Sequence, residues 1–121
     1  MQYMLMCCFD EHAWNKLPHT DKDRIMREYG AVMQSLIMNG KFRGGGRLHS
    51  TSAATTVRMK QGMTILTDGP FAETKEQFGG YHLVECKDLD EAIAIASRIP
   101  TLLAGGAIEV RPVAMSEDRP Q

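Results

Sequence analysis

The order of its apolar patterns is the feature that most constrains what this chain can fold into. Short apolar or alternating segments, typical of strands, lie at residues 2–9, 55–60, 63–68, 80–86 and 107–113. Two segments with apolar residues at every third or fourth position, typical of amphipathic helices, lie at residues 20–39 and 88–99. This order of strand, helix, several strands, helix and strand predicts an α+β fold, a ferredoxin-like sandwich with an inserted β-hairpin.

Capping residues bound the two expected helices. Thr20, with Asp23 three positions later, predicts the start of the first helix, and Gly40 predicts its end in a left-handed conformation. Asp88 predicts the start of the second helix, which ends before Pro100. The apolar stripe of the first helix comprises Ile25, Met26, Tyr29, Val32, Met33, Leu36 and Ile37. Two amphipathic helices on one sheet leave its other face open, so we expect a homodimer formed through that face.

Glycines mark the middle of the chain. Gly44–Gly46 weaken a strand and indicate a bulge or a close approach of backbone. Gln61 and Gly62 separate two alternating segments and favour a tight hairpin between them.

Length and charge exclude several classes of protein. The 121 residues fit one domain, with a polar tail at 116–121 that need not be ordered. Fourteen basic and fifteen acidic residues give a net charge of −1, which argues against direct nucleic-acid binding. Neither a membrane span nor a signal peptide is recognisable, and three cysteines without metal-ligand spacing indicate reduced thiols, so we expect a cytoplasmic protein. The four histidines also lack the spacing of metal ligands, so no metal site is predicted.

The stretch TDGPFAETKEQFGGYHLVE, residues 67–85, concentrates the candidate site residues. Asp68, Gly69 and Pro70 predict a rigid turn with Phe71 aimed inward. Turn formation alone is enough to explain why these residue types occur here. Turn chemistry does not explain the charged residues that follow. We therefore predict a cleft in which Asp68 and His82 are catalytic and the substrate is bound by Arg58, Phe71, Glu73 and Lys75. The alternatives are a solvated turn and a packed or surface histidine.

The motif from Thr67 to Gln77, followed by Gly79-Gly80-Tyr81, resembles the DGPF group of the YCII-related family. The resemblance extends to Thr55–Arg58 and to the segments DLDEAIAIASRIP and IEVRPV, so that it covers residues 3–113. It implies a dimeric α+β barrel. Related proteins are proposed to be enzymes that use a His-Asp pair, with the His on the first helix and the Asp before the proline that ends the second. In this sequence those positions hold Tyr29 and Ile99.

Two functions follow from the resemblance and the charged segment. The first is a small-molecule-binding protein or enzyme with a cleft near the DGPF turn, whose substrate, reaction and cofactor no residue pattern specifies. The second is a noncatalytic dimeric interaction module, which the resemblance links to regulation by extracytoplasmic-function sigma factors.

Overall fold

The computed structural model describes residues 1–115 and has a mixed α+β architecture with two antiparallel sheets. Four strands form the main sheet in the order β2 (Phe42–Arg47), β5 (Gln77–Glu85), β1 (Gln2–Phe9) and β6 (Ala107–Pro112). β1 lies inside this sheet, as its apolar sequence predicts, and β6 with its proline lies at an edge. The α+β prediction is confirmed. The predicted polar tail at 116–121 lies outside the described residues.

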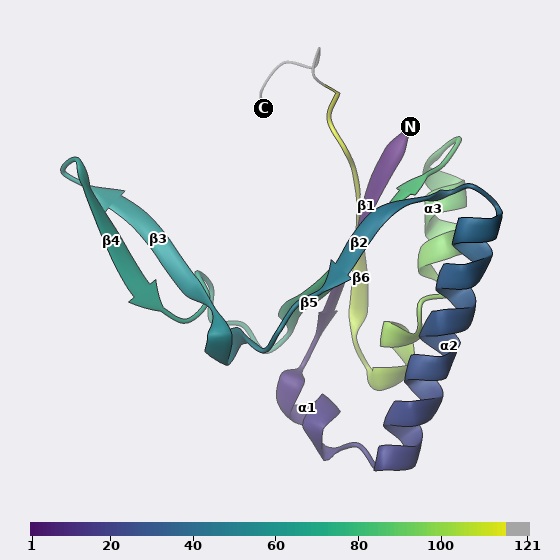
Figure 1. Ribbon diagram of the computed structural model, residues 1–121, viewed down its shortest axis with the longest axis horizontal. Helices are drawn as coiled ribbons and strands as arrows, with labels where there is room; N and C mark the ends of the chain where they lie inside the picture. Colours follow the sequence, from purple (N-terminus) through teal and green to yellow (C-terminus); the bar gives the residue numbers. More distant parts are fainter. Residues whose placement is uncertain (116–121) are drawn as a thin grey trace.

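Two helices, α2 (His19–Met38) and α3 (Leu89–Ala96), cover the same face of the main sheet (Figure 1). The core between them and the sheet is formed by residues from β1, α2, β5 and α3 and from the segments after β5 and α3; its largest fully buried side chains are Leu5, Leu36, Ile99, Val84 and Cys86. Within residues 1–115, no helix has the length and apolar character needed to cross a membrane. The other face of the sheet carries no helix (Figure 1).

A short helix before α2 was not expected from the sequence. In α1 (Glu11–Lys16), the carboxylate of Asp10 accepts hydrogen bonds from the backbone N–H groups of His12 and Ala13. The predicted Thr20 cap is wrong, because α2 already begins at His19, directly after Pro18, without a side-chain cap. The Pro18 carbonyl accepts the first hydrogen bonds of the helix, from the N–H groups of Asp21 at 3.0 Å and Lys22 at 3.1 Å.

The end of α2 agrees with the prediction. Gly40 has a φ of +69°, and its N–H donates to the carbonyl of Ile37 at 3.1 Å. The second helix is shorter than predicted, since α3 ends at Ala96 and Pro100 instead opens the 3₁₀ helix η2 (Pro100–Ala104).

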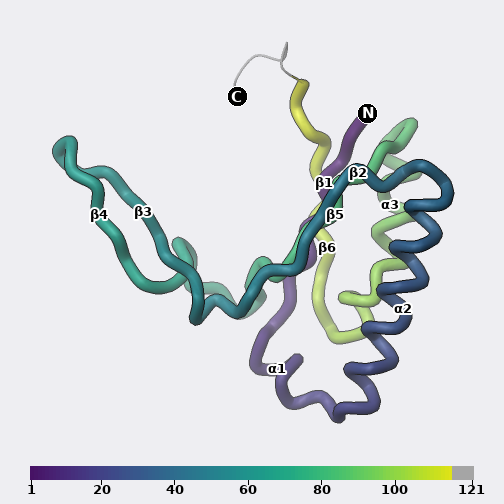
Figure 2. The backbone as a smooth tube through the Cα atoms, viewed as in Figure 1, coloured from purple at the N-terminus to yellow at the C-terminus, as the bar shows by residue number. Residues whose placement is uncertain are grey.

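The predicted hairpin is confirmed and forms a sheet of its own. β3 (Thr55–Lys60) pairs with β4 (Met63–Asp68), and Gln61 and Gly62 both have positive φ in the turn between them. Figure 2 shows the chain leaving β2, running out along this hairpin and returning into β5. We call residues 55–68 the arm, because they project away from the rest of the molecule and all but Thr56 are exposed (Figure 1).

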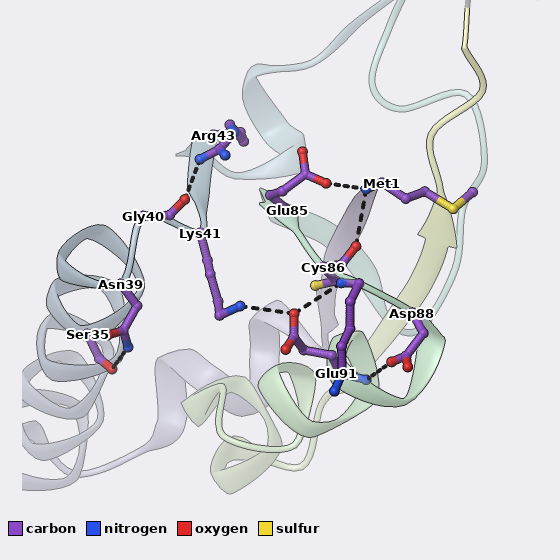
Figure 3. A network of polar contacts seen from close by, with 11 residues as sticks. Met1, Ser35, Asn39, Gly40, Lys41, Arg43, Glu85, Cys86, Asp88 and Glu91 are labelled. Carbon is purple, nitrogen blue, oxygen red and sulfur yellow. Dashed lines mark hydrogen bonds and ion pairs between the residues drawn. The ribbon is translucent and has the colours of Figure 1, made fainter.

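A polar network closes the end of the sheet near the start of α3 (Figure 3). The Lys41 ammonium lies 3.0 Å from the Glu91 carboxylate and so joins the segment after α2 to α3. Asp88 caps α3 by accepting a hydrogen bond from the Glu91 N–H at 2.9 Å. These contacts tie the start of α3 to the segment that follows α2.

Candidate functional site

A cavity of about 300 Å³ lies between α2 and the helix-covered face of the main sheet. Its walls are mainly apolar and come from α1, α2, the strands and η2; they include Phe9, Trp14, Ile25, Met26, Met33 and Phe42. Four polar side chains also line it, those of Tyr29, Arg47, His82 and Thr101. A concave apolar space with a few converging polar groups is the usual form of a small-molecule site.

Strand register explains why these residues meet. Side chains alternate between sheet faces, and cross-strand partners share a face. Leu5, His82 and Gly45 form one row across β1, β5 and β2. Cys7, Gly80 and Arg47 form the next row on the same face. Since Leu5 is buried in the core, both rows face α2, and the second row ends at Arg47, which lines the cavity and is exposed.

Glycines beside the cavity let other groups approach the strand backbone closely. A Cβ on Gly45 would lie 2.6 Å from the Tyr81 carbonyl oxygen, and one on Gly79 would lie 2.2 Å from the Phe9 ring. A Cβ on Gly80 would lie 3.1 Å from the Gly46 carbonyl oxygen. The close approach of backbone predicted for the glycine run of β2 is thus present at Gly45. We call the backbone of Gly45, Gly46, Gly79 and Gly80 the glycine floor of the cavity.

Tyr29 projects from α2 toward the sheet and joins three elements. Its hydroxyl is hydrogen-bonded to the hydroxyl of Thr101 in η2 and lies 3.6 Å from the Cys7 sulfur in β1. Burial raises the pKa of Tyr29, so the phenol stays protonated at neutral pH. In related proteins a His and an Asp are expected at the positions of Tyr29 and Ile99. Here Ile99 is buried, and the polar partner of Tyr29 is Thr101, two residues further on.

His82 stands beside Tyr29, with the two ring centroids 6.1 Å apart and the ring planes at 44°. Burial lowers the pKa of His82, which favours the neutral imidazole. Within residues 1–115, the His82 ring makes no hydrogen bond. Neither of its nitrogen atoms is fully buried. The imidazole nitrogens are therefore free to meet a ligand in the cavity.

Of the six residues that the sequence singled out, His82 alone lines the cavity, as far as residues 1–115 show. Arg58 and Asp68 are exposed on the arm, and Glu73 and Lys75 are exposed in the loop that follows it. The prediction that Phe71 points inward is wrong: its side chain is 76% exposed and lies under the Arg58 guanidinium, which is 5.1 Å from the ring centroid. Arg58, Pro70 and Ile65 instead line a separate groove of about 520 Å³ along the arm.

The DGPF turn itself is held by backbone contacts. Gly69 has a φ of +103°, donates to the carbonyl of Ala54 at 2.8 Å and accepts from the Thr56 hydroxyl at 2.7 Å. This geometry needs a glycine, as the turn reading predicts. No group of three potential ligands for a metal ion occurs within residues 1–115.

Sequence reasoning did not bring Arg47, Tyr29 and Thr101 together with His82, because these four residues come from four separate elements. One available signal was the spacing within β5 and β2. A glycine two residues before His82, together with the glycine run before Arg47, places bare backbone next to polar side chains on one sheet face.

Comparisons with known proteins place the chain in a family. Residues 1–116 match the YCII-related domain. An uncharacterised protein of Rhizobium meliloti (strain 1021) is 40% identical over 116 residues, which are 95% of this chain and 94% of that protein. A similar solved structure is that of 5-chloro-2-hydroxyhydroquinone dehydrochlorinase (TftG) from Burkholderia phenoliruptrix AC1100 in complex with 2,5-dihydroxybenzoquinone. It has a TM-score of 0.51 and 17% identity, with 97% of each chain covered. The domain match and the curated relative show that this chain belongs to the YCII-related family.

Proposed function

We propose that this protein binds a small, largely apolar molecule in the cavity beneath α2 and acts on it by proton transfer. The observation that carries the proposal is the convergence of His82 and Tyr29 on one apolar cavity of about 300 Å³. The dehydrochlorinase with a similar fold was solved with a single-ring compound bound, which supports a ligand of this size.

His82 has the properties of a general base. Its pKa is lowered by burial, so the imidazole is neutral and able to accept a proton from a bound molecule at neutral pH. The protonated phenol of Tyr29, beside it, is suited to hydrogen-bond the oxygen on which negative charge then develops. In this proposal the imidazole takes the proton, and Tyr29 stabilises the resulting anion until the proton returns or a leaving group departs.

Ligand binding to the purified protein tests the proposal. A thermal-shift and calorimetric screen of single-ring phenols, quinones and benzoates is expected to give hits that Ala104→Phe abolishes by filling the cavity. Asp68→Asn, on the arm, serves as the matched control and is expected to leave binding unchanged. A hit lost in Asp68→Asn and kept in Ala104→Phe would move the site to the DGPF turn.

His82→Ala tests the chemical role separately from binding. For a ligand that undergoes turnover, we expect His82→Ala to reduce kcat by about 10²–10⁴-fold, the usual contribution of a general base. The expected change in KM is smaller. Unchanged kcat in this variant would contradict the assignment of His82 as the base.

We also propose that two copies pair through the open face of the main sheet to form a ferredoxin-like dimeric α+β barrel. The strand order β2-β5-β1-β6 with both helices on one face supports this fold. Half-buried side chains on the open face supply an apolar surface; they are Met4, Met6, Cys8, Tyr81 and Leu83. The comparisons name no sigma factor, so the regulatory alternative gains no support from them.

Light scattering of the eluted protein tests the dimer. Leu83→Glu places a charge on the open face and is expected to convert a dimer to a monomer. Ile37→Glu, at a 60% exposed position of α2, is the control and is expected to leave the mass unchanged. A wild-type protein that elutes as a monomer across the micromolar range would contradict the proposed barrel.

A further inference from the structure

Arg47 gives the cavity a charge preference. It is the last residue of β2 and pairs with Gly80, so its side chain stands on the cavity face of the sheet. Among the lining residues that the structure describes, none is acidic, and Arg47 alone carries a permanent charge. Its positive charge acts at the Tyr29 hydroxyl, where it opposes the rise in the Tyr29 pKa. Gly45, two residues before Arg47, pairs with His82, so Arg47 stands one row along the same sheet face from His82.

Arg47 has no anionic partner within residues 1–115. The ion pairs of this region involve other residues, and no side-chain hydrogen bond holds the guanidinium. By contrast, Arg43, four residues earlier on β2, donates to the carbonyls of Gly40 and Phe42. A guanidinium at the mouth of an apolar cavity is suited to bind a carboxylate through two parallel hydrogen bonds.

The glycine floor selects a flat ligand. The glycines of the floor have no side chain to extend into the cavity, and an aromatic ring, that of Phe9, already packs directly on Gly79. Phe9 and Trp14, whose ring centroids lie 6.3 Å apart at 60°, form an aromatic wall beside this floor. Planar rings pack well against such surfaces through stacked or edge contacts.

Volume limits the number of rings. The cavity of about 300 Å³ is at the lower end of the range for ligand sites. An apolar cavity of roughly 150 Å³ accommodates benzene. The space here therefore suits one ring with one or two substituents.

From these observations, and resting on the proposed function, we infer that the ligand is a single-ring aromatic carboxylate. Its carboxylate pairs with Arg47 at the mouth, its ring lies against the glycine floor, and a ring substituent faces Tyr29 and His82. This assigns specificity to Arg47, which stands on β2 one row along the same sheet face from the proposed base.

Calorimetric titration with matched probes tests the inference. Benzoate and 2-hydroxybenzoate are compared with benzamide, which keeps the shape and removes the charge, with cyclohexanecarboxylate, which keeps the charge and loses planarity, and with acetate. We expect the benzoates to bind at least tenfold more tightly than any other probe, since charged hydrogen bonds and ring contacts both contribute. Arg47→Gln is expected to weaken benzoate binding about ten- to a hundredfold and to leave benzamide binding unchanged.

Arg27→Gln is the matched control, because it removes one positive charge from an exposed position of α2 outside the cavity. It is expected to leave all affinities unchanged. Equal binding of benzoate and benzamide, or unchanged benzoate binding in Arg47→Gln, would overturn the inference while leaving the cavity as a binding site. Absence of binding by every ring compound, phenols and quinones included, would overturn the proposed function as well. Circular dichroism of each variant checks that the fold is retained.

Discussion

The arm and the cavity differ in how sequence information is distributed. The arm and the turn after it carry the continuous DGPF motif, yet their side chains are almost all exposed. The cavity has no continuous motif, and its polar residues come from α2, β2, β5 and η2. A motif that is continuous in sequence can thus identify a family through backbone geometry, while the chemistry lies where separate segments meet.

The largest difference we expect between the two regions is in stability. Leu5 in β1 is fully buried, whereas Leu66 on the arm is 67% exposed. Leu5→Ala should lower the free energy of unfolding by about 2–5 kcal/mol, and Leu66→Ala by less than about 0.5 kcal/mol. Urea unfolding followed by circular dichroism measures both. A large loss in Leu66→Ala would mean that the arm packs against a second molecule in solution.

Glycine substitutions sharpen the comparison within the cavity itself. Gly45→Ala brings a methyl group within 2.6 Å of the Tyr81 carbonyl oxygen and should lower the free energy of unfolding by about 1–3 kcal/mol. At neighbouring Gly46 the nearest atom to a new methyl group is Tyr81 Cε1 at 3.7 Å. Gly46→Ala should therefore change the free energy of unfolding by less than about 0.5 kcal/mol. Equal effects in the two variants would show that strand propensity, rather than contact, sets the cost.

Gly30 tests whether a position on a core helix is necessarily packed. Gly30 lies inside α2, and a Cβ at this position would have no neighbour within 4 Å. Gly30→Ala should therefore raise the free energy of unfolding by about 0.5–1 kcal/mol, because alanine loses less backbone freedom in a helix. Thermal unfolding would detect this as a higher Tm. A lower Tm would indicate that the outer side of α2 is covered in solution.

The smallest difference we expect is in the pH dependence of stability. Burial lowers the pKa of His82 below its usual 6.5, so the folded protein binds fewer protons than the unfolded chain as the pH falls. The resulting stability is present above about pH 6.5 and is lost as the pH falls through the lowered pKa. His82→Gln should flatten the fall in stability between about pH 7 and about pH 5, whereas His49→Gln, on an exposed loop, should not.

Local sequence patterns predicted most of the fold. The strands, the α2 end at Gly40 and the turn at Gln61 and Gly62 each depend on residues close together in the chain. The helix starts were less predictable. Asp10 caps α1 within a segment that has no apolar stripe, and Pro18 competes with Thr20 as the entry to α2.

The site was predictable only in part, for a related reason. His82 was singled out because it lies in a strand next to the charged motif, and the structure places it in the lining of the cavity. Its proximity to Tyr29 and Arg47 depends on the pairing of β2 with β5 and on the position of α2 across them. Those are long-range relations, which a single sequence does not encode as a local pattern. Charge density in the loop after β4 therefore drew attention to residues far from the cavity.

The two adjacent thiols of β1 lie on opposite faces of the main sheet, so alkylation of each thiol reports on a different face. Cys7 lines the cavity, while Cys8 points to the open face and is half-buried. A ligand that fills the cavity should slow alkylation of Cys7, and a second subunit on the open face should slow alkylation of Cys8. Because the two residues lie side by side in one proteolytic fragment, mass spectrometry of that fragment would report ligand occupancy and self-association in a single experiment.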